Sequence, residues 1–168
     1  MTNKFTINTW LYISVAIAIV VFSGTPTVGQ TFRIQNQGKT GHGFTTTEGN
    51  LTALHVGGLP FDYLYPAMDI GINTRNKSAK GFQVSELPPA YFIDRRGTRH
   101  RVVELGPTGL QTSVSLRFYP GESGMPVFAE DGTVCCVVLG NHFDAGRWHG
   151  RVSKIQPLLD AISKAKIK

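Results

Sequence analysis

A serine between two glycines is the residue of this sequence best suited to covalent chemistry. Ser123 lies in the stretch 119–128, which reads Tyr-Pro-Gly-Glu-Ser-Gly-Met-Pro-Val-Phe. The glycines and prolines predict a tight turn that exposes the hydroxyl and leaves backbone N–H groups beside it. The N–H groups of Gly121 and Ser123 could converge on a developing oxyanion, where loss of one donor typically costs roughly 2.7–4 kcal/mol of transition-state stabilisation. The stretch suits acyl transfer, although similar turns also occur in ordinary loops.

Two residues upstream are of the types that such a serine needs as partners. His55 closes the apolar run 51–55, and Asp69 opens a second apolar run at 69–72. A serine hydroxyl is a poor nucleophile at neutral pH unless an imidazole accepts its proton, and a carboxylate then fixes the tautomer of the imidazole. The sequence therefore predicts a catalytic triad of His55, Asp69 and Ser123.

These three motifs resemble those of the chymotrypsin-like serine proteases, and they occur in the same order. Thr-Ala-Leu-His55 is similar to the family's Thr-Ala-Ala-His, Asp69-Ile-Gly-Ile to its Asp-Ile-Ala-Leu, and Gly121-Glu-Ser-Gly-Met-Pro to its Gly-Asp-Ser-Gly-Gly-Pro. The resemblance covers about residues 31–162. It implies two β-barrels with the triad in the cleft between them, a serine endopeptidase activity and a polypeptide substrate.

Two other residues compete for these roles. His42 lies between two glycines and matches a stretch of the first barrel that supplies no catalyst in the family, so we expect a histidine at a strand edge. Asp62 lies between two aromatic residues and lacks the apolar run that would bury a triad carboxylate, so we prefer Asp69. The segment between His55 and Asp69 reaches up to ~45 Å when extended, which allows a short loop to bring the two together.

The composition predicts an all-β fold. The chain has 168 residues, of which 41% are apolar and 17% are charged, so it is globular and long enough for one compact unit or two small ones. Its 19 glycines and 9 prolines recur between short apolar runs, which is typical of many short strands. We expect two six-stranded Greek-key β-barrels, the first of them shortened.

The predicted division of the chain follows from these patterns. Residues 30–80 form the N-terminal barrel with His55 and Asp69, and a polar segment at 73–80 begins the connection. Residues 81–168 form the C-terminal barrel with Ser123. The run 133–139 is continuously apolar, which predicts a strand buried on both faces. Apolar residues at 155, 158, 159 and 162 keep helical spacing and predict a C-terminal helix.

Residues 1–29 differ from the rest of the chain. A lysine precedes the apolar run 10–22, which would span about 20 Å as a helix, less than the roughly 30 Å of a bilayer core unless flanking residues from 7 onward contribute. Both a signal peptide cleaved before Gln30 and a retained membrane anchor through residues 7–22 fit this pattern. We expect the protein to be membrane-associated or secreted.

The net charge bears on the possible partners, and the cysteine content bears on how the barrels are held together. The net charge of +6 favours anionic partners, but arginines and aromatic residues do not alternate as in an RNA-binding platform, so we expect no nucleic acid, with RNA a weak possibility. The adjacent Cys135 and Cys136 would form only a strained disulfide. The barrels must therefore pack without disulfides, as in bacterial and RNA-virus members of the family. No pattern of metal ligands is present, and we expect no cofactor.

The resemblance also implies where the substrate binds. Leu139, Gly140 and His142 would form the rim of the specificity pocket. Arg117, six residues before the nucleophile, takes the position of the pocket-base aspartate in the trypsin branch, and would select Glu or Asp before the scissile bond. The alternative is that Arg117 points to solvent, since arginine is rarely buried unless paired.

Two functions from different classes follow. The first is a serine endopeptidase that processes viral or other proteins through an acyl-enzyme. The second is a non-catalytic binding module with the protease fold, tethered at a membrane, in which the shortened first barrel no longer aligns Asp69.

Overall fold

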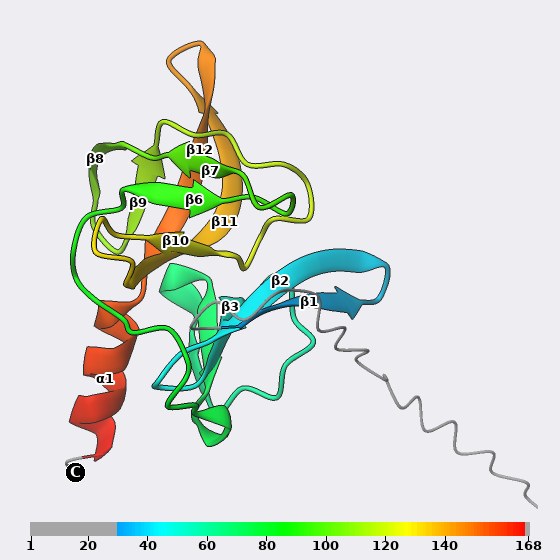
Figure 1. Ribbon diagram of the computed structural model, residues 1–168, viewed down its shortest axis with the longest axis vertical. Coiled ribbons are helices and arrows are strands. Elements are labelled where there is room, and N and C mark those ends of the chain that lie inside the picture. Colours follow the sequence, from blue (N-terminus) through cyan, green and yellow to red (C-terminus); the bar gives the residue numbers. More distant parts are fainter. Residues whose placement is uncertain (1–29, 167–168) are drawn as a thin grey trace, which may run out of the picture.

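The computed structural model describes residues 30–166, without the side chains of residues 107 and 108, and shows two antiparallel sheets with one helix beside them (Figure 1). The first sheet has the strand order β1-β2-β3-β5-β4, and the second has the order β7-β6-β10-β11-β12-β9-β8. The all-β prediction is confirmed, with five and seven strands in place of six and six. The first sheet is the smaller one, as expected. The predicted N-terminal leader lies outside the described residues.

The first half contains five short strands and two 3-10 turns. These are β1 (Thr31–Asn36), β2 (Lys39–Thr45), β3 (Asn50–Ala53), β4 (Tyr63–Tyr65), η1 (Pro66–Met68), β5 (Ile70–Asn73) and η2 (Thr74–Asn76). The turn between β2 and β3 ends before Asn50, which pairs with Thr45 of β2. The hydroxyl of Thr46 closes this turn by donating to the carbonyl of Gly49 at 2.9 Å and accepting from the N–H of Glu48.

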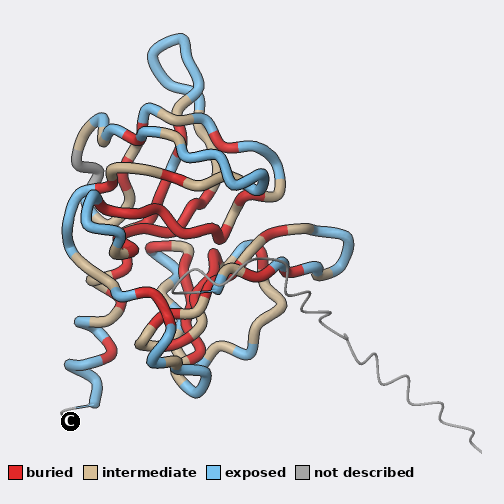
Figure 2. Tube along the Cα trace, in the orientation of Figure 1, coloured by how far each residue is buried: buried red, intermediate tan, exposed pale blue. Residues whose placement is uncertain are grey.

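The second half is built around one long strand. Its elements are β6 (Tyr91–Ile93), β7 (Arg99–Arg101), β8 (Glu104–Thr108), β9 (Gln111–Val114), β10 (Pro126–Phe128), β11 (Val134–Asp144), β12 (Arg147–Lys154) and α1 (Gln156–Lys166). The first six residues of β11 are all buried, which confirms the prediction from its apolar sequence. Beyond them the β11–β12 hairpin projects from the molecule with exposed residues at its tip (Figures 1 and 2).

A shared core joins the two halves. One cluster of buried side chains contains Phe44 of the first sheet, Val137 of the second and Leu158 of α1. In Figure 2 the buried segments run through the facing parts of both sheets. The helix is therefore packed on a core to which both halves contribute, not on the second barrel alone. Within residues 30–166 no helix is long and apolar enough to cross a bilayer.

Candidate active site

The pairing of β3 with β5 places His55 against Asp69. Ala53 pairs with Ile70, so the turn that follows β3 lies beside the residue that precedes β5. The Asp69 carboxylate accepts the backbone N–H of His55 at 3.1 Å through Oδ1, and its Oδ2 lies 2.5 Å from Nδ1 of the imidazole. Asp69 thus holds both the backbone and the ring of His55. The proton on Nδ1 is directed at the carboxylate, which leaves Nε2 as the proton acceptor.

Asp69 adopts this position in a left-handed conformation, with φ of 54°, where it ends the 3-10 turn η1. Aspartate and asparagine tolerate this region better than most residues. The competing carboxylate of Asp62 is turned elsewhere, because it accepts the N–H of Thr74 at 2.8 Å and the hydroxyl of Thr74 at 2.5 Å. The structure therefore brings Asp69, and not Asp62, to the imidazole.

The loop that carries Ser123 depends on its two glycines. Gly121 has φ of 87° and Gly124 has φ of 85°, both in the region that favours glycine. A Cβ atom on Gly124 would lie 1.8 Å from the carbonyl oxygen of His42, so no larger residue fits there without a shift of β2. The N–H of Gly124 donates to the carbonyl of Val138 at 2.7 Å, which ties the loop to β11. The predicted tight turn is the conformation observed.

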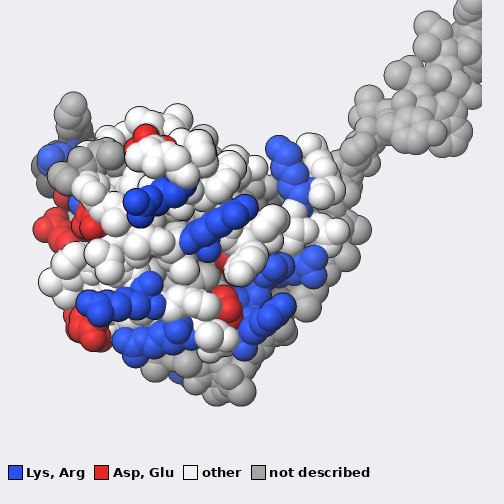
Figure 3. Space-filling model, turned by 90° about the horizontal axis from the view of Figure 1, so that it is seen from above, with Lys and Arg blue, Asp and Glu red and all other residues white. Residues whose placement is uncertain are grey.

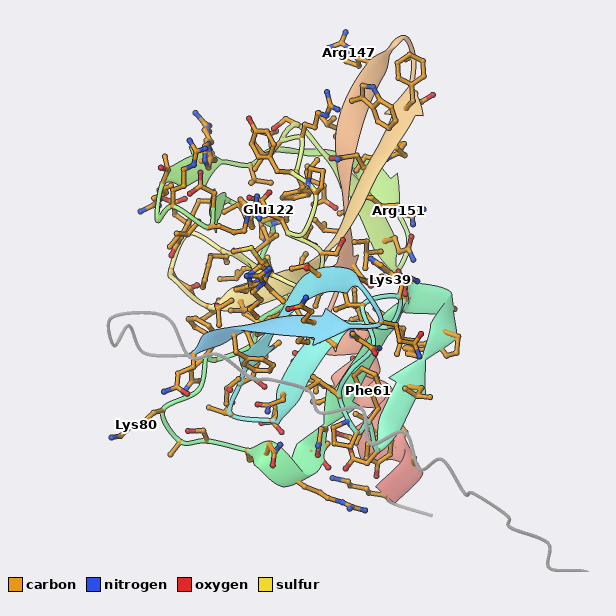
Figure 4. All side chains as sticks on the ribbon, turned by 90° about the vertical axis from the view of Figure 1, so that its right-hand side faces the viewer. Lys39, Phe61, Lys80, Glu122, Arg147 and Arg151 are labelled. Atoms are coloured by element: carbon orange, nitrogen blue, oxygen red, sulfur yellow. The ribbon has the colours of Figure 1, made fainter. Side chains whose placement is uncertain are left out.

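The two amides expected to form the oxyanion hole are available. Neither the N–H of Gly121 nor that of Ser123 donates to an acceptor within residues 30–166. Between them, the Glu122 side chain turns inward and is only 2% exposed (Figure 4). Its Oε2 accepts the N–H of Tyr119 at 2.7 Å, and its Oε1 lies 4.0 Å from Nε of Arg95. The buried Glu122 carboxylate therefore anchors the loop from inside.

His42 has a larger role than the sequence indicated. Its backbone N–H donates to the carbonyl of Ser123 at 2.8 Å, and its Nδ1–H donates to the carbonyl of Gly121 at 2.8 Å. Burial lowers the pKa of His42, and the positive charges of Arg95 and Arg33 lower it further, against the opposing effect of the Gly121 hydrogen bond. His42 therefore connects the first sheet to the nucleophile loop. Only the three-dimensional approach of β2 to that loop reveals this contact.

His55 and Ser123 line the same pocket, but no hydrogen bond joins them. The Ser123 hydroxyl donates to the carbonyl of Leu139 at 3.1 Å. The pocket has a volume of about 560 Å³. Its lining is Arg33, Gly38, Lys39, Thr40, His55, Val56, Arg95, Pro120, Gly121 and Ser123. The Ser123 hydroxyl must leave the Leu139 carbonyl before the imidazole can accept its proton.

The residues predicted to bind substrate fall in different places. Arg117 is exposed, and its guanidinium lies 5.3 Å from the centre of the Trp148 ring. This geometry fits the interpretation in which Arg117 points to solvent, and not the one in which it lies at the base of the specificity pocket. Asn141, which the sequence did not single out, bridges β11 to the loop by accepting the N–H of Phe118 and donating to the Phe118 carbonyl, both at 2.8 Å.

His142 lies in a second pocket. Its Nε2 is 3.2 Å from the hydroxyl of Ser113, and both line a cavity of about 510 Å³ together with Arg151. Ser123 does not line this cavity. Leu139 contacts Ser123 directly, because its carbonyl accepts the Ser123 hydroxyl. Gly140 follows Leu139 with a positive φ of 145°, which favours glycine.

Among the described residues, no three histidine, cysteine, aspartate or glutamate side chains are grouped so that they could hold a metal ion.

Comparison with solved structures identifies the fold. No model of a known protein family matches the chain, and no curated protein sequence matches it either. The structure is similar to a human pathogenic astrovirus serine protease, with a TM-score of 0.56 and 20% identity over 76% of this chain and 90% of that one. It is also similar to Rv3671c from M. tuberculosis H37Rv, with a TM-score of 0.52 and 18% identity over 80% of this chain and 85% of that one. A second structure, of the Rv3671c protease in an inactive form, gives the same score. The chain therefore has the chymotrypsin-like serine protease fold.

Proposed function

We propose that the protein is a serine endopeptidase in which Ser123 is the nucleophile, His55 the general base and Asp69 the residue that orients His55. One observation carries this proposal. An imidazole held by a carboxylate at 2.5 Å shares a pocket with a serine, and the N–H groups beside that serine have no acceptor in the described protein. General base, nucleophile and oxyanion donors are the groups that peptide-bond hydrolysis through an acyl-enzyme requires.

The reaction can be written from these atoms. The Ser123 hydroxyl turns from the Leu139 carbonyl towards Nε2 of His55 and gives it a proton as Oγ attacks the peptide carbonyl carbon. The N–H groups of Gly121 and Ser123 stabilise the resulting oxyanion, and Asp69 stabilises the imidazolium. Nε2 then protonates the departing amine, which leaves an acyl-enzyme. A water molecule repeats the sequence, with His55 again as base, and releases the acid.

The segment after Leu139 is the natural wall for the part of the substrate that precedes the scissile bond. The Leu139 carbonyl lies within hydrogen-bonding distance of Ser123 Oγ, so a substrate along this segment would have its carbonyl near the nucleophile. Gly140 leaves space on the wall, since no atom lies within 4 Å of where its Cβ would be. His142 is three residues further along and lies in the 510 Å³ cavity with Arg151. We assign these residues to substrate binding and do not assign Arg117 to it.

A second candidate is a non-catalytic binding module with the same fold. The observation in its favour is that the Ser123 hydroxyl donates to Leu139 and not to His55. In an active enzyme this is a resting rotamer, because catalytic hydrogen bonds often form only when substrate binds. In a binding module it would be the permanent state of the side chain.

A serine-reactive fluorophosphonate probe distinguishes the two candidates. We expect the full chain to be labelled and the label to disappear in Ser123→Ala, because only an activated serine reacts at a useful rate. Ser115 is an exposed serine in the same half of the chain, and Ser115→Ala is the matched control that should keep full labelling. Absence of labelling in the parent, or equal labelling in Ser123→Ala, would support the binding module.

The N-terminal residues 1–29 bear on where the protein acts. We propose that residues 7–22 direct the protein to a membrane, either as a cleaved signal or as an anchor, and that its substrates are viral or other polypeptides that need processing there. The apolar run 10–22 supports this. Mass spectrometry of the mature N-terminus separates the two forms, since a cleaved protein would begin at or near Gln30.

A further inference from the structure

The pocket that contains His55 and Ser123 is lined by three cationic side chains. Arg33 comes from β1, Lys39 from β2, and Arg95 from the turn between β6 and β7. All three residues are exposed. The guanidinium of Arg95 lies close to the nucleophile loop, 3.5 Å from where a Cβ of Gly121 would be. Two sheets thus place positive charge at one side of the candidate active site.

The charge of this pocket is largely uncompensated. Within residues 30–166, neither Arg33 nor Lys39 makes an ion pair. Arg95 has one anionic neighbour, the buried carboxylate of Glu122, at 4.0 Å. Two further carboxylates lie near the pocket. That of Asp69 is held by His55, and that of Asp94 accepts hydrogen bonds from His100 at 2.8 Å and from the N–H groups of Arg96 and Thr98. A ligand with negative charge would meet at least two free cations beside the reacting groups.

The cationic lining continues into a neighbouring groove. A second cavity of about 820 Å³ shares Arg33 and Arg95 with the first pocket, and its lining adds His42, Asp94 and Arg96. An extended chain leaving the first pocket can therefore pass from one cation to the next. Lys and Arg side chains are widespread on the molecular face seen in Figure 3, with fewer Asp and Glu among them.

The position of the pocket relative to Ser123 identifies the part of the substrate that would occupy it. No residue of β11 lines the pocket, although the Leu139 carbonyl of β11 lies 3.1 Å from Ser123 Oγ. His55, which protonates the departing amine in the proposed reaction, does line the pocket. In that reaction the pocket would receive the residues that follow the scissile bond, which belong to the leaving fragment.

We propose that the Arg33, Lys39 and Arg95 pocket is a binding site for acidic side chains of the substrate, and that the protein prefers Asp or Glu just after the bond it cleaves. This inference rests on the proposed function, whose substrate class it makes more specific. Aspartate and glutamate side chains can accept hydrogen bonds from guanidinium and ammonium groups in good geometry. Cations around the cleft also raise the association rate of an anionic peptide.

The lining favours a peptide over RNA. No Phe, Tyr or Trp side chain lines the pocket with Ser123, so it lacks the platform of large aromatic rings on which successive bases stack. In the neighbouring groove, one face of the Tyr91 ring is stacked on Phe128, and the guanidinium of Arg99 lies 3.8 Å from the ring centre. The aromatic faces there already have partners.

Binding to the full chain carrying Ser123→Ala tests the site without any need for turnover. The probe is a fluorescein-labelled peptide of alternating alanine and glutamate, and the reference is the same peptide with glutamine in place of glutamate. We expect the acidic peptide to bind about tenfold more tightly at low salt, and we expect Arg33→Gln combined with Lys39→Gln to remove that difference.

The matched control combines Lys80→Gln with Arg147→Gln, which removes the same two residue types and the same charge. Both control residues are exposed, and Figure 4 shows them at opposite ends of the molecule, away from Lys39. The control should retain the tenfold preference. Equal losses in the two double variants would mean that net charge alone attracts the peptide, and the site would be refuted. Displacement by a uridine decamer at concentrations below those of the acidic peptide itself would make it a nucleic-acid site.

Cleavage by the parent protein separates this inference from the proposed function. In a library of peptides from a digested proteome, we expect acidic residues to be enriched after the cut, and the enrichment to vanish in Arg33→Gln/Lys39→Gln. Cleavage without such enrichment would refute the acidic preference and leave the peptidase intact. Specific binding of the acidic peptide with no cleavage of any kind would refute the peptidase and leave the cationic site intact.

Discussion

The two sheets supply the candidate site in different ways. The first sheet contributes His55 and Asp69 from adjacent strand ends, and the pair is held by its own contacts while the two side chains remain 43% and 24% exposed. The second sheet contributes Ser123 on a loop that is held by β11, by the buried Glu122 and, from the first sheet, by His42. Changes to the acid–base pair should therefore affect chemistry with little loss of stability. Changes to the loop should affect the fold as well.

The largest effect expected from a single change in the first sheet is that of Asp69→Asn. We expect turnover to fall by about four orders of magnitude near neutral pH, because the amide no longer holds the reactive tautomer or stabilises the imidazolium. Asparagine tolerates the left-handed backbone of residue 69, so the free energy of unfolding should change little. Steady-state hydrolysis and denaturant unfolding measure the two quantities.

Asp62→Asn is the matched control. Its carboxylate contacts Thr74, so the loss of activity should be small. If Asp62→Asn impaired turnover more than Asp69→Asn did, the assignment of the triad carboxylate would be wrong.

In the second sheet, Gly124→Ala should lower stability strongly, whereas Asp69→Asn should lower turnover with little change in stability. An added Cβ would overlap the carbonyl oxygen of His42 at 1.8 Å, so β2 or the loop must move, and we expect unfolding to become easier by more than about 3 kcal/mol. The comparison is Gly97→Ala, which has a similar φ of 82° and nothing within 4 Å of the added atom. That variant should cost only about 1–2 kcal/mol from the left-handed backbone. Equal costs in denaturant unfolding would show that the loop is not packed tightly against β2.

The smallest effect expected is a pH dependence of stability from His42. Its pKa in the folded protein is below 6.5, so the unfolded chain binds more protons below that pH, and the free energy of unfolding should fall as the pH falls. His42→Gln keeps an N–H donor for Gly121 but does not titrate, and should flatten this slope below about pH 6.5.

The carboxylate of Asp94 does not titrate within this window until the pH nears 3.8. A hydrogen bond from His100 and others from Thr98 and Arg96 lower the pKa of Asp94 to about 2, so its contribution is lost only at more acidic pH, below its ordinary value of 3.8. If the slope were unchanged in His42→Gln, then another group, and not His42, would account for the acid sensitivity.

Residue types and their order were enough to predict the fold class and the candidate triad, because local patterns carry that information. The glycines around Ser123 are needed by the turn itself, and the apolar run at β11 reflects burial on both faces. That Asp69 would reach His55 was an expectation that rested on motif order and on the length of the segment between them. The pairing of β3 with β5 that brings the two together was not predicted.

What the sequence did not predict depends on contacts between distant segments. His42 meets the nucleophile loop 79 positions away, and Asn141 meets Phe118 across 23 positions. Arg33, Lys39 and Arg95 come together only because β1, β2 and the β6–β7 turn converge on one pocket. Arg117 shows the reverse case, in which a position inferred from resemblance finds a different neighbour, the ring of Trp148.

The central claim is that the imidazole from the first sheet and the hydroxyl from the second act as one catalytic unit, and the hydrolysis rates of Ser123→Ala, His55→Ala and the double variant test it most directly. The claim predicts that each single variant loses nearly all activity and that the double variant loses almost nothing more, since members of a triad are grossly non-additive. Losses that add in the double variant would contradict it, because they would show that the two residues act independently.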